Sequence, residues 1–291
     1  MVGAQSEVGA VRRIVLRHAR EALGGEEWIA REWRGLNYRG PPAFAAALAE
    51  YDRFAALLED LGATLCFAPA DARVGLDSMY VRDAAVACEH GAVLCNMGKA
   101  ARRDEPQSLR GELVRLGVPV LGAISGAGRL EGGDVVWLDR RTLAVGRGYR
   151  TNDEGVAQLR ALLGDSVDTL VVVPLAHHRG PDDVFHLMSI LSPVDRDLAL
   201  VYSPLMPVPL RERLLDRGFG LVEVPPEEFE TLGCNVLAVA PRRCVMLAGN
   251  PRTRERLERA GVEVFEFDGR EICAKGAGGP TCLTRPLERA S

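Results

Sequence analysis

Short apolar segments and longer amphipathic stretches alternate along the chain in a recurring order. Residues 82–98, RDAAVACEHGAVLCNMG, contain two apolar runs around a polar turn with a glycine, a pattern typical of a β-hairpin. The helical pattern EPQSLRGELVRLG follows, and the strand pattern VPVLGAI comes after it. The sequence therefore predicts a unit of two strands, one helix and one strand (ββαβ).

The same unit is predicted again along the rest of the chain. Further hairpins are expected at 132–148, 185–203 and 235–250, each followed by a helix pattern and a strand pattern. The fifth hairpin needs both ends of the chain, because CLTRPLER near the C-terminus would pair with VRRIVLRHA near the N-terminus. The helix of this fifth unit is expected at 42–62.

The repeat length is roughly 50 residues, which is typical of propellers and arrays whose units bury their faces against one another. Because the two ends would pair, we expect one domain over residues 1–291. Its predicted fold is a five-bladed α/β propeller of ββαβ units with pseudo-fivefold symmetry. A generic α/β protein with two domains is the alternative, but no low-complexity linker interrupts the pattern.

The composition is that of an ordinary globular protein, with 47% hydrophobic residues, 26% charged residues and a net charge of -4. No basic stripe offers a nucleic acid a binding surface, and apolar runs such as 169–176 are too short to cross a membrane. The first residues lack the pattern of a secretory signal. We expect a cytoplasmic protein with neither a nucleic-acid nor a membrane partner, and a homodimer is left open.

The seven cysteines have neither the dense spacing of a disulfide scaffold nor a CxxC pair, so structural zinc is not expected. Five lie in apolar strand-like segments and are predicted to be buried: Cys66, Cys88, Cys95, Cys234 and Cys244. Cys282 differs, because it follows Gly278 and Gly279. These glycines would let the backbone approach a bound ligand closely.

Polar residues open the first strand of every predicted hairpin. They are Asp83, Glu131 with Asp134, His186, Asn235 and Cys282. Each alone has a structural explanation, since a single cysteine or histidine is commonly part of a core and an acid beside glycines is commonly in a turn. Equivalent strand starts in a closed ring converge on its axis, however, so these residues are predicted to form one pocket. A cysteine, a histidine and carboxylates in one pocket indicate catalysis.

Four motifs resemble those of the guanidino-group modifying enzymes. They are DSMYVRD (77–83), LEGGDVVWLDRRTLAVGRGYRTNDEG (130–155), FHLMS (185–189) and GGPTCLTRPL (278–287). This superfamily includes dimethylarginine dimethylaminohydrolases, arginine deiminases, arginine dihydrolases and amidinotransferases. The resemblance covers essentially the whole chain and implies the five-bladed α/β propeller, or pentein, that the repeat also predicts.

The resemblance implies a role for each matching residue. Cys282 would attack the guanidinium carbon and form a covalent thiouronium intermediate. His186 would protonate the leaving amine and then activate water, and Glu131 would orient His186 and contact the substrate. Asp83 would accept two hydrogen bonds from the guanidinium. Neither a metal nor another cofactor is implied.

The resemblance also implies ligands for the amino-acid end of the substrate. Arg102 and Arg150 match positions that bind an α-carboxylate, although either could be a solvated surface arginine and Arg103 is a rival to Arg102. Asp77 is expected to line the mouth of the pocket. Asn235 is expected to donate to backbone groups of the substrate.

One departure from the superfamily bears on the substrate. Deiminases and amidinotransferases carry an aspartate two residues after the histidine, whereas this chain carries Met188. The dimethylarginine hydrolases also lack that aspartate, so the sequence favours an Nω-substituted arginine that yields citrulline and an amine. Arginine deiminase, arginine dihydrolase and amidinotransferase remain alternatives, as does a non-enzymatic arginine-binding protein. Residues 18–42 are expected to form either a lid or a surface helix and loop packed by Trp28 and Trp33.

Overall fold

Five three-stranded sheets make up the β-structure of the computed structural model, which describes residues 3–183 and 185–290. The strands are β1 (Val11–Leu16), β2 (Thr64–Phe67), β3 (Ala85–Cys88), β4 (Gly91–Leu94), β5 (Val120–Ala123), β6 (Val135–Trp137), β7 (Thr142–Arg147), β8 (Thr169–Pro174), β9 (Leu191–Asp195), β10 (Leu198–Val201), β11 (Gly220–Glu223), β12 (Leu237–Ala240), β13 (Arg243–Leu247), β14 (Glu263–Phe267) and β15 (Arg285–Arg289). The helices are α1 (Ala19–Leu23), α2 (Glu26–Glu32), α3 (Phe44–Asp60), α4 (Glu105–Arg115), α5 (Asp153–Leu163), α6 (Val208–Asp216), α7 (Pro226–Phe229) and α8 (Pro251–Arg259).

Every sheet combines an antiparallel pair with a third, parallel strand. The predicted hairpins are confirmed as β3–β4, β6–β7, β9–β10 and β12–β13, and a parallel strand joins each after a helix. The pairing of the two chain ends is also confirmed, because β15 runs antiparallel to β1, with Val11 opposite Arg289. The strand β2 then adds to β1 in parallel, after the long helix α3.

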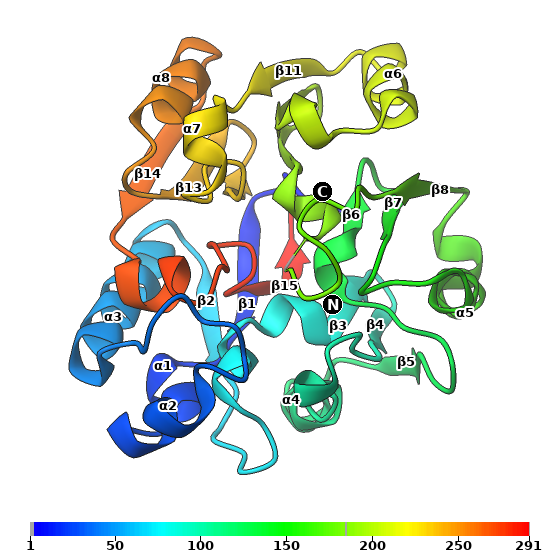
Figure 1. The fold of residues 1–291 in the computed structure, drawn as a ribbon. Helices are drawn as coiled ribbons and strands as arrows, with labels where there is room; N and C mark the ends of the chain where they lie inside the picture. The colour runs from blue at the N-terminus through cyan, green and yellow to red at the C-terminus, as the bar shows by residue number, and fades with distance from the viewer. Residues whose placement is uncertain (1–2, 184, 291) are drawn as a thin grey trace.

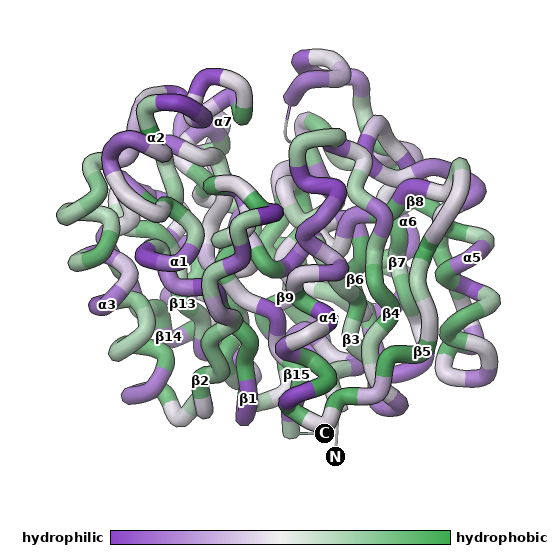
Figure 2. Tube along the Cα trace, turned by 90° about the horizontal axis from the view of Figure 1, so that it is seen from below, coloured by the Kyte–Doolittle hydropathy of each residue, from purple (hydrophilic) through white to green (hydrophobic). Residues whose placement is uncertain are grey.

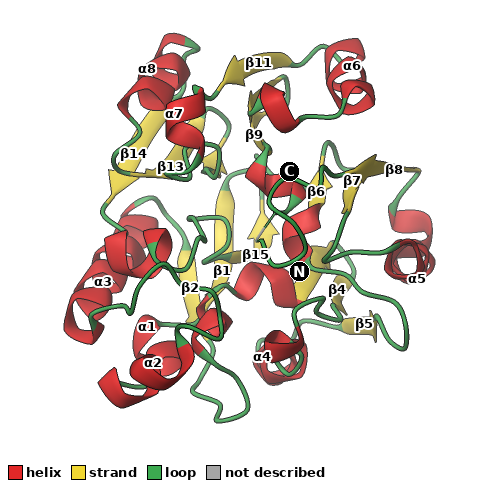
Figure 3. Cartoon of the chain, viewed as in Figure 1, coloured by secondary structure: helices red, strands yellow, loops and turns green. Residues whose placement is uncertain are grey.

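The sheets lie around a common centre, and the longer helices lie toward the outside (Figures 1 and 3). The apolar core is divided among neighbouring units. One cluster, for example, combines Val86 and Val93 of β3–β4 with Val135 and Leu143 of β6–β7. Strands covered on both sides in this way are rich in apolar residues throughout, which explains the continuous apolar runs in the sequence. The tube in Figure 2 shows these apolar strands inside the molecule.

The two ends of the described chain meet at one end of the molecule, and α7 lies at the other (Figure 2). Gly3 bridges to Glu288, which brings the ends together beside β15. The described part of the chain contains no helix of the length and apolar character that a membrane span requires.

Two expectations about local packing need refinement. Cys66, on β2, is only half-buried, whereas the four other cysteines predicted to be buried are buried. Residues 18–42 form α1, α2 and a loop. Leu23 and Ile29 of the two helices are buried in the same core cluster as α3, and Trp28 and Trp33 pack against it.

Candidate active site

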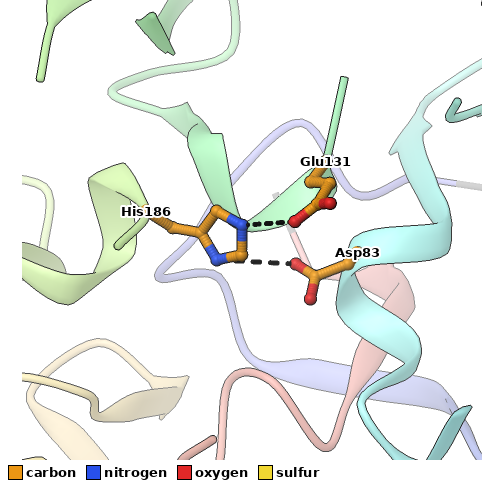
Figure 4. Close-up of side chains that lie close together, drawn as sticks. All are labelled: Asp83, Glu131 and His186. Carbon is orange, nitrogen blue, oxygen red and sulfur yellow. Dashed lines mark hydrogen bonds and ion pairs between the residues drawn. The ribbon is translucent and has the colours of Figure 1, made fainter. Parts of the chain in front are cut away.

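Three of the predicted site residues come from three different units and point toward one another (Figure 4). Asp83 lies in the turn Val81–Ala84 before β3, Glu131 precedes the turn before β6, and His186 precedes the turn before β9. All three side chains are almost completely buried. The three residues occupy equivalent positions in the repeat, before the first strand of a hairpin, and the fold brings them together as predicted.

Glu131 holds His186 through a direct hydrogen bond of 2.7 Å between Oε2 and Nε2. The other carboxylate oxygen accepts hydrogen bonds from the backbone N–H groups of Gly98, at 2.9 Å, and Lys99, at 3.2 Å. Arg150 Nη1 lies 3.6 Å from the same oxygen. These contacts fix the carboxylate, and the carboxylate in turn fixes the imidazole ring.

Asp83 faces the other nitrogen of the ring, with its Oδ1 atom 3.9 Å from His186 Nδ1. The same oxygen accepts a hydrogen bond of 2.9 Å from the N–H of Gly133. A side chain at position 133 would not fit, because its Cβ would lie 2.6 Å from His186 Nδ1 and 2.8 Å from Asp83 Oδ1. Glycine at position 133 is thus required by the close approach of these two side chains, and glycine at position 132 by the carbonyl of Arg82, which would lie 2.1 Å from a Cβ there.

The surrounding carboxylates keep His186 charged. Burial by itself lowers the pKa of the imidazole, but Asp83, Asp134 and Glu131 outweigh it and raise the pKa from 6.5 to about 9. The pKa of Glu131 is lowered despite its burial, because of its hydrogen bond and charge interaction with His186. At neutral pH the structure therefore presents an imidazolium that can donate a proton.

Cys282 lies between Thr281 and β15, and Asn235 Nδ2 donates a hydrogen bond of 3.3 Å to its sulfur. Burial raises the pKa of the Cys282 thiol, and Asp83 adds to the rise, while the hydrogen bond from Asn235 opposes it. The Asn235 amide oxygen accepts hydrogen bonds from the N–H and hydroxyl groups of Thr281, at 3.2 and 2.6 Å. Asn235 thus orients the turn that presents the sulfur.

The glycines before Cys282 allow a close approach to protein groups, whereas the sequence suggested an approach to a ligand. A Cβ at Gly279 would lie 2.4 Å from the amide oxygen of Asn235, and a Cβ at Gly278 would lie 2.4 Å from the ring of Tyr80. The short turn is therefore shaped by its packing against two neighbouring side chains.

One pocket is shared by His186, Cys282, Asn235 and Met188. Phe185 adds a further apolar wall beside Met188. The pocket thus places a sulfur and an imidazolium against the same enclosed space, next to an apolar surface.

The rim of this pocket carries charged groups that the sequence did not identify. Glu230 pairs with Arg39 at 3.2 Å and with Arg179 at 2.7 Å, and all three residues line the pocket. Arg39 belongs to the segment 18–42, so the end of this segment reaches the rim although its helices pack in the core. The pairs join positions far apart in the chain, and no local pattern in the sequence signals them.

The guanidinium of Arg102 is hydrogen-bonded to Asp83 and to other protein oxygens. Its Nη1 donates to Asp83 Oδ2 at 2.6 Å, its Nε and Nη2 donate to Glu105 at 2.9 and 2.8 Å, and Nη2 also donates to the carbonyl of Tyr80 at 3.0 Å. Every nitrogen of this guanidinium therefore already donates to a protein oxygen. The α-carboxylate role predicted for Arg102 stays a prediction, and the structure gives the residue a second task, which is to position Asp83. Glu105, three residues later, was the local signal for this pairing.

Arg150 and Asp77 have different surroundings. Arg150 is buried beside Glu131, its Nη2 lies 3.5 Å from the carbonyl oxygen of Asp183, and its Nε has no hydrogen-bond partner in the described part of the chain. Asp77 is buried and pairs with Lys99 Nζ at 2.6 Å. Lys99 also donates to the carbonyl of Leu36 at 2.7 Å, which ties Asp77 to the segment 18–42. That Asp77 lines the mouth of the pocket stays a prediction.

Asp83, Glu131 and His186 are also of the types that bind metal ions, with ligand atoms within 4.8 Å of one another. Their hydrogen bonds argue against this use. Glu131 Oε2 and His186 Nε2 are bonded to each other, and Arg102 donates to Asp83. A cation would displace these bonds and meet the positive charges of Arg102 and Arg150.

The sequence is similar to known proteins along most of its length. Residues 39–289 match the family model described as N,N dimethylarginine dimethylhydrolase, eukaryotic. The chain belongs to the dimethylarginine dimethylaminohydrolase family. The N(G),N(G)-dimethylarginine dimethylaminohydrolase of Streptomyces coelicolor is 33% identical over 247 residues, which cover 82% of this chain and 84% of that protein. The enzyme of the same name from Pseudomonas aeruginosa is 27% identical over 248 residues, or 85% of this chain and 91% of that protein.

Solved structures agree with this membership in the dimethylarginine dimethylaminohydrolase family. The Pseudomonas aeruginosa enzyme in complex with citrulline superposes with a TM-score of 0.74 at 25% identity, covering 94% of this chain and 98% of that chain. An amidinotransferase from Microseira wollei has a TM-score of 0.80 at 16% identity, covering 100% of this chain and 98% of that chain, which shows the shared fold alone. The predicted superfamily is therefore confirmed.

Proposed function

We propose that this protein is a cysteine-dependent hydrolase of the guanidinium group of an Nω-substituted arginine, releasing an amine and leaving citrulline. The observation that carries the proposal is the shared pocket of Cys282 and His186, in which Glu131 holds His186 as an imidazolium. Membership in a family of hydrolases that act on C–N bonds of guanidino groups supports it.

The proposed reaction begins with the binding of a cation. Asp83 orients the guanidinium, since each of its carboxylate oxygens has a lone pair beyond those used by Arg102 and Gly133. The positive charge of the substrate lowers the cost of ionising the Cys282 thiol, whose pKa is raised in the free protein. The thiol loses its proton to solvent, and the thiolate then attacks the guanidinium carbon.

His186 acts twice in this scheme. It first gives its proton to the departing amine as the C–N bond breaks, which leaves a thiouronium on Cys282. The neutral imidazole then accepts a proton from water, and the resulting hydroxide adds to the same carbon. Collapse of this adduct breaks the C–S bond and expels the thiolate of Cys282, while the hydroxyl proton of the adduct passes to solvent, where the released amine takes it up. Citrulline is left, and His186 is again protonated.

The apolar wall beside the pocket favours a substituted guanidinium. Met188 and Phe185 offer a methyl group burial worth roughly 0.8 kcal/mol per CH₂. An unsubstituted nitrogen placed there would leave N–H donors unpaired at a cost of about 1–3 kcal/mol. Arg150, with its unpaired Nε, is proposed to bind the α-carboxylate at the other end of the substrate.

The architecture and the oligomeric state belong to the same proposal. The five sheets are proposed to form a single propeller domain with pseudo-fivefold symmetry over residues 1–291, acting in the cytoplasm without a metal or another cofactor. The pairing of β1 with β15 supports this closure. A homodimer is not required by the arrangement of the site, to which one chain contributes all the predicted residues.

The test is a panel of guanidino compounds assayed for the ureido product, for ammonia and for the released amine. We expect kcat/KM for monomethylarginine and dimethylarginine to exceed that for arginine. A preference for arginine with ammonia release would instead favour a deiminase, and an arginine deiminase of Mycobacterium avium is 30% identical over 55% of this chain. Turnover that requires glycine or lysine as acceptor would favour an amidinotransferase.

A further inference from the structure

Three arginine side chains are buried near the point where the two ends of the chain meet. We refer to Arg82, Arg285 and Arg289 as the axial arginines, and their exposed fractions are 1%, 5% and 6%. Arg285 and Arg289 lie on β15, and Arg82 lies directly before Asp83 in the turn Val81–Ala84. Burial lowers the pKa of Arg285 to about 9, with a contribution from the charge of Arg82. These cations are therefore close enough to repel one another.

A single carboxylate, that of Glu7, pairs with the axial arginines among the described residues. Glu7 accepts a hydrogen bond of 2.7 Å from Arg82 Nη2. Arg289 donates instead to two neutral carbonyls, those of Gly9 at 2.7 Å and Ala238 at 2.8 Å, and Arg285 donates to the carbonyl of Arg82. Three guanidinium groups against one carboxylate leave two positive charges without a paired anion.

Several donors of this cluster are also unsatisfied. The Nε atoms of Arg82, Arg285 and Arg289, and Nη2 of Arg289, are buried without a hydrogen-bond partner in residues 3–183 and 185–290. Buried donors in native proteins are nearly always satisfied by protein groups, ordered water or an ion. Because the cluster also carries an excess of positive charge, an anion satisfies both requirements and a water molecule only one.

A route from solvent to this cluster exists. A cavity of about 1090 Å³ is lined by Glu7 and Arg289 together with Gly3 and Glu288 near the chain ends. The catalytic pocket is lined instead by Phe229 of α7, at the opposite end of the molecule (Figure 2). Ions can therefore reach Arg289, the axial arginine that lines this cavity, without passing through the catalytic pocket.

We propose that the axial arginines bind a small monovalent inorganic anion of the size of chloride or bromide. The anion accepts hydrogen bonds from the unpaired donors of Arg289 and its neighbours, in the charge-assisted geometry that guanidinium groups favour. Anion binding at this site does not depend on which guanidino compound is the substrate.

The anion site would link the pairing of β15 with β1 to the turn Val81–Ala84, which carries Asp83. The backbone N–H of Arg82 donates to the carbonyl of Cys282 at 3.1 Å, and Arg285 caps the carbonyl of Arg82. Neutralising the cluster therefore stabilises the junction of β15 with the turn that carries Asp83. The expected consequence is greater stability of the whole protein, since β15 closes the ring.

The test is thermal unfolding of the full-length protein in sodium gluconate, with chloride added at constant ionic strength. We expect Tm to rise with the logarithm of the chloride concentration once chloride exceeds its Kd, and the rise should be about 3 °C when chloride is tenfold above its Kd. Arg289→Gln should remove this rise. Arg196→Gln is the matched control, because Arg196 is an exposed arginine on the wall of the same cavity, and this variant should keep the rise.

Crystals grown in bromide give a direct readout that needs no variant. An anomalous peak within hydrogen-bond distance of Arg289 supports the proposal, and this result stands even if Arg289→Gln fails to fold. Equal Tm values in chloride and gluconate without a bromide peak overturn it. Loss of the chloride effect in Arg196→Gln as well would also overturn it, because the effect would then be one of general surface charge.

Discussion

Replacing Glu131 by glutamine tests the electrostatics of the site most closely. A pKa of about 9 for His186, against its ordinary value of 6.5, corresponds to about 3 kcal/mol of preference for the imidazolium. Glu131 makes the direct hydrogen bond to the ring, at 2.7 Å, whereas Asp83 lies 3.9 Å away. A hydrogen bond to a charged group contributes about 1.5–3 kcal/mol. We therefore expect the pKa of His186 to fall to about 7–8 in Glu131→Gln.

The same change has a defined effect on stability. A group whose pKa is raised by folding stabilises the protein fully below its unfolded pKa, and this contribution is lost as pH rises through the folded pKa. The contribution of His186 to the free energy of unfolding of the wild-type protein therefore declines between pH 6.5 and about 9. In Glu131→Gln this decline should be smaller and should end near pH 8.

The assay is an NMR titration of the histidine ring signals, with His186 identified by its absence in His186→Gln. Glu230→Gln is the matched control, because Glu230 also lines the pocket but pairs with Arg39 and Arg179. The alkaline limb of the kcat/KM profile should move to lower pH with the pKa of His186, since the imidazolium is the proton donor. An unchanged pKa of His186 in Glu131→Gln would refute the reasoning.

The remaining predictions concern the nucleophile, the apolar wall and the closure of the ring. Cys282→Ser should abolish turnover while Tm stays within about 1 °C, because the hydroxyl remains protonated where a thiolate forms; measurable turnover by this variant argues against the assignment. Met188→Asp should shift the kcat/KM ratio toward arginine by on the order of ten- to a hundredfold, by restoring a charged clamp; an unchanged ratio means that Met188 does not face the guanidinium. Deleting residues 278–291 removes β15 and should lower Tm together with activity, and an unchanged Tm contradicts the closed ring.

The repeat could be predicted from sequence because the spacing of apolar residues changes in the same order in each unit, from the strand pattern to the helix pattern and back to the strand pattern. The convergence of Asp83, Glu131 and His186 followed from their equivalent positions before the first strand of each hairpin. These are consequences of topology, which the hydrophobic pattern encodes.

The detailed contacts could not be predicted in the same way. The partners of Arg102 depend on the packing of its turn against Asp83 and Glu105, and the rim pair of Arg39 with Glu230 joins positions 191 residues apart. Arg285 lies inside the motif GGPTCLTRPL, but the sequence pattern assigns this arginine no role. Long charged side chains reach across several elements, so their partners are fixed only when the chain is folded.

The covalent intermediate gives the most direct test of the central claim. The protein is mixed with dimethylarginine, quenched in acid during turnover and analysed by peptide mass spectrometry, with Cys273→Ser as the control, since Cys273 is a buried cysteine beside the site. The account predicts a thiouronium adduct on Cys282 in both proteins, formed as fast as citrulline appears. Citrulline formation without an adduct on Cys282, or by a protein that lacks this sulfur, would contradict it.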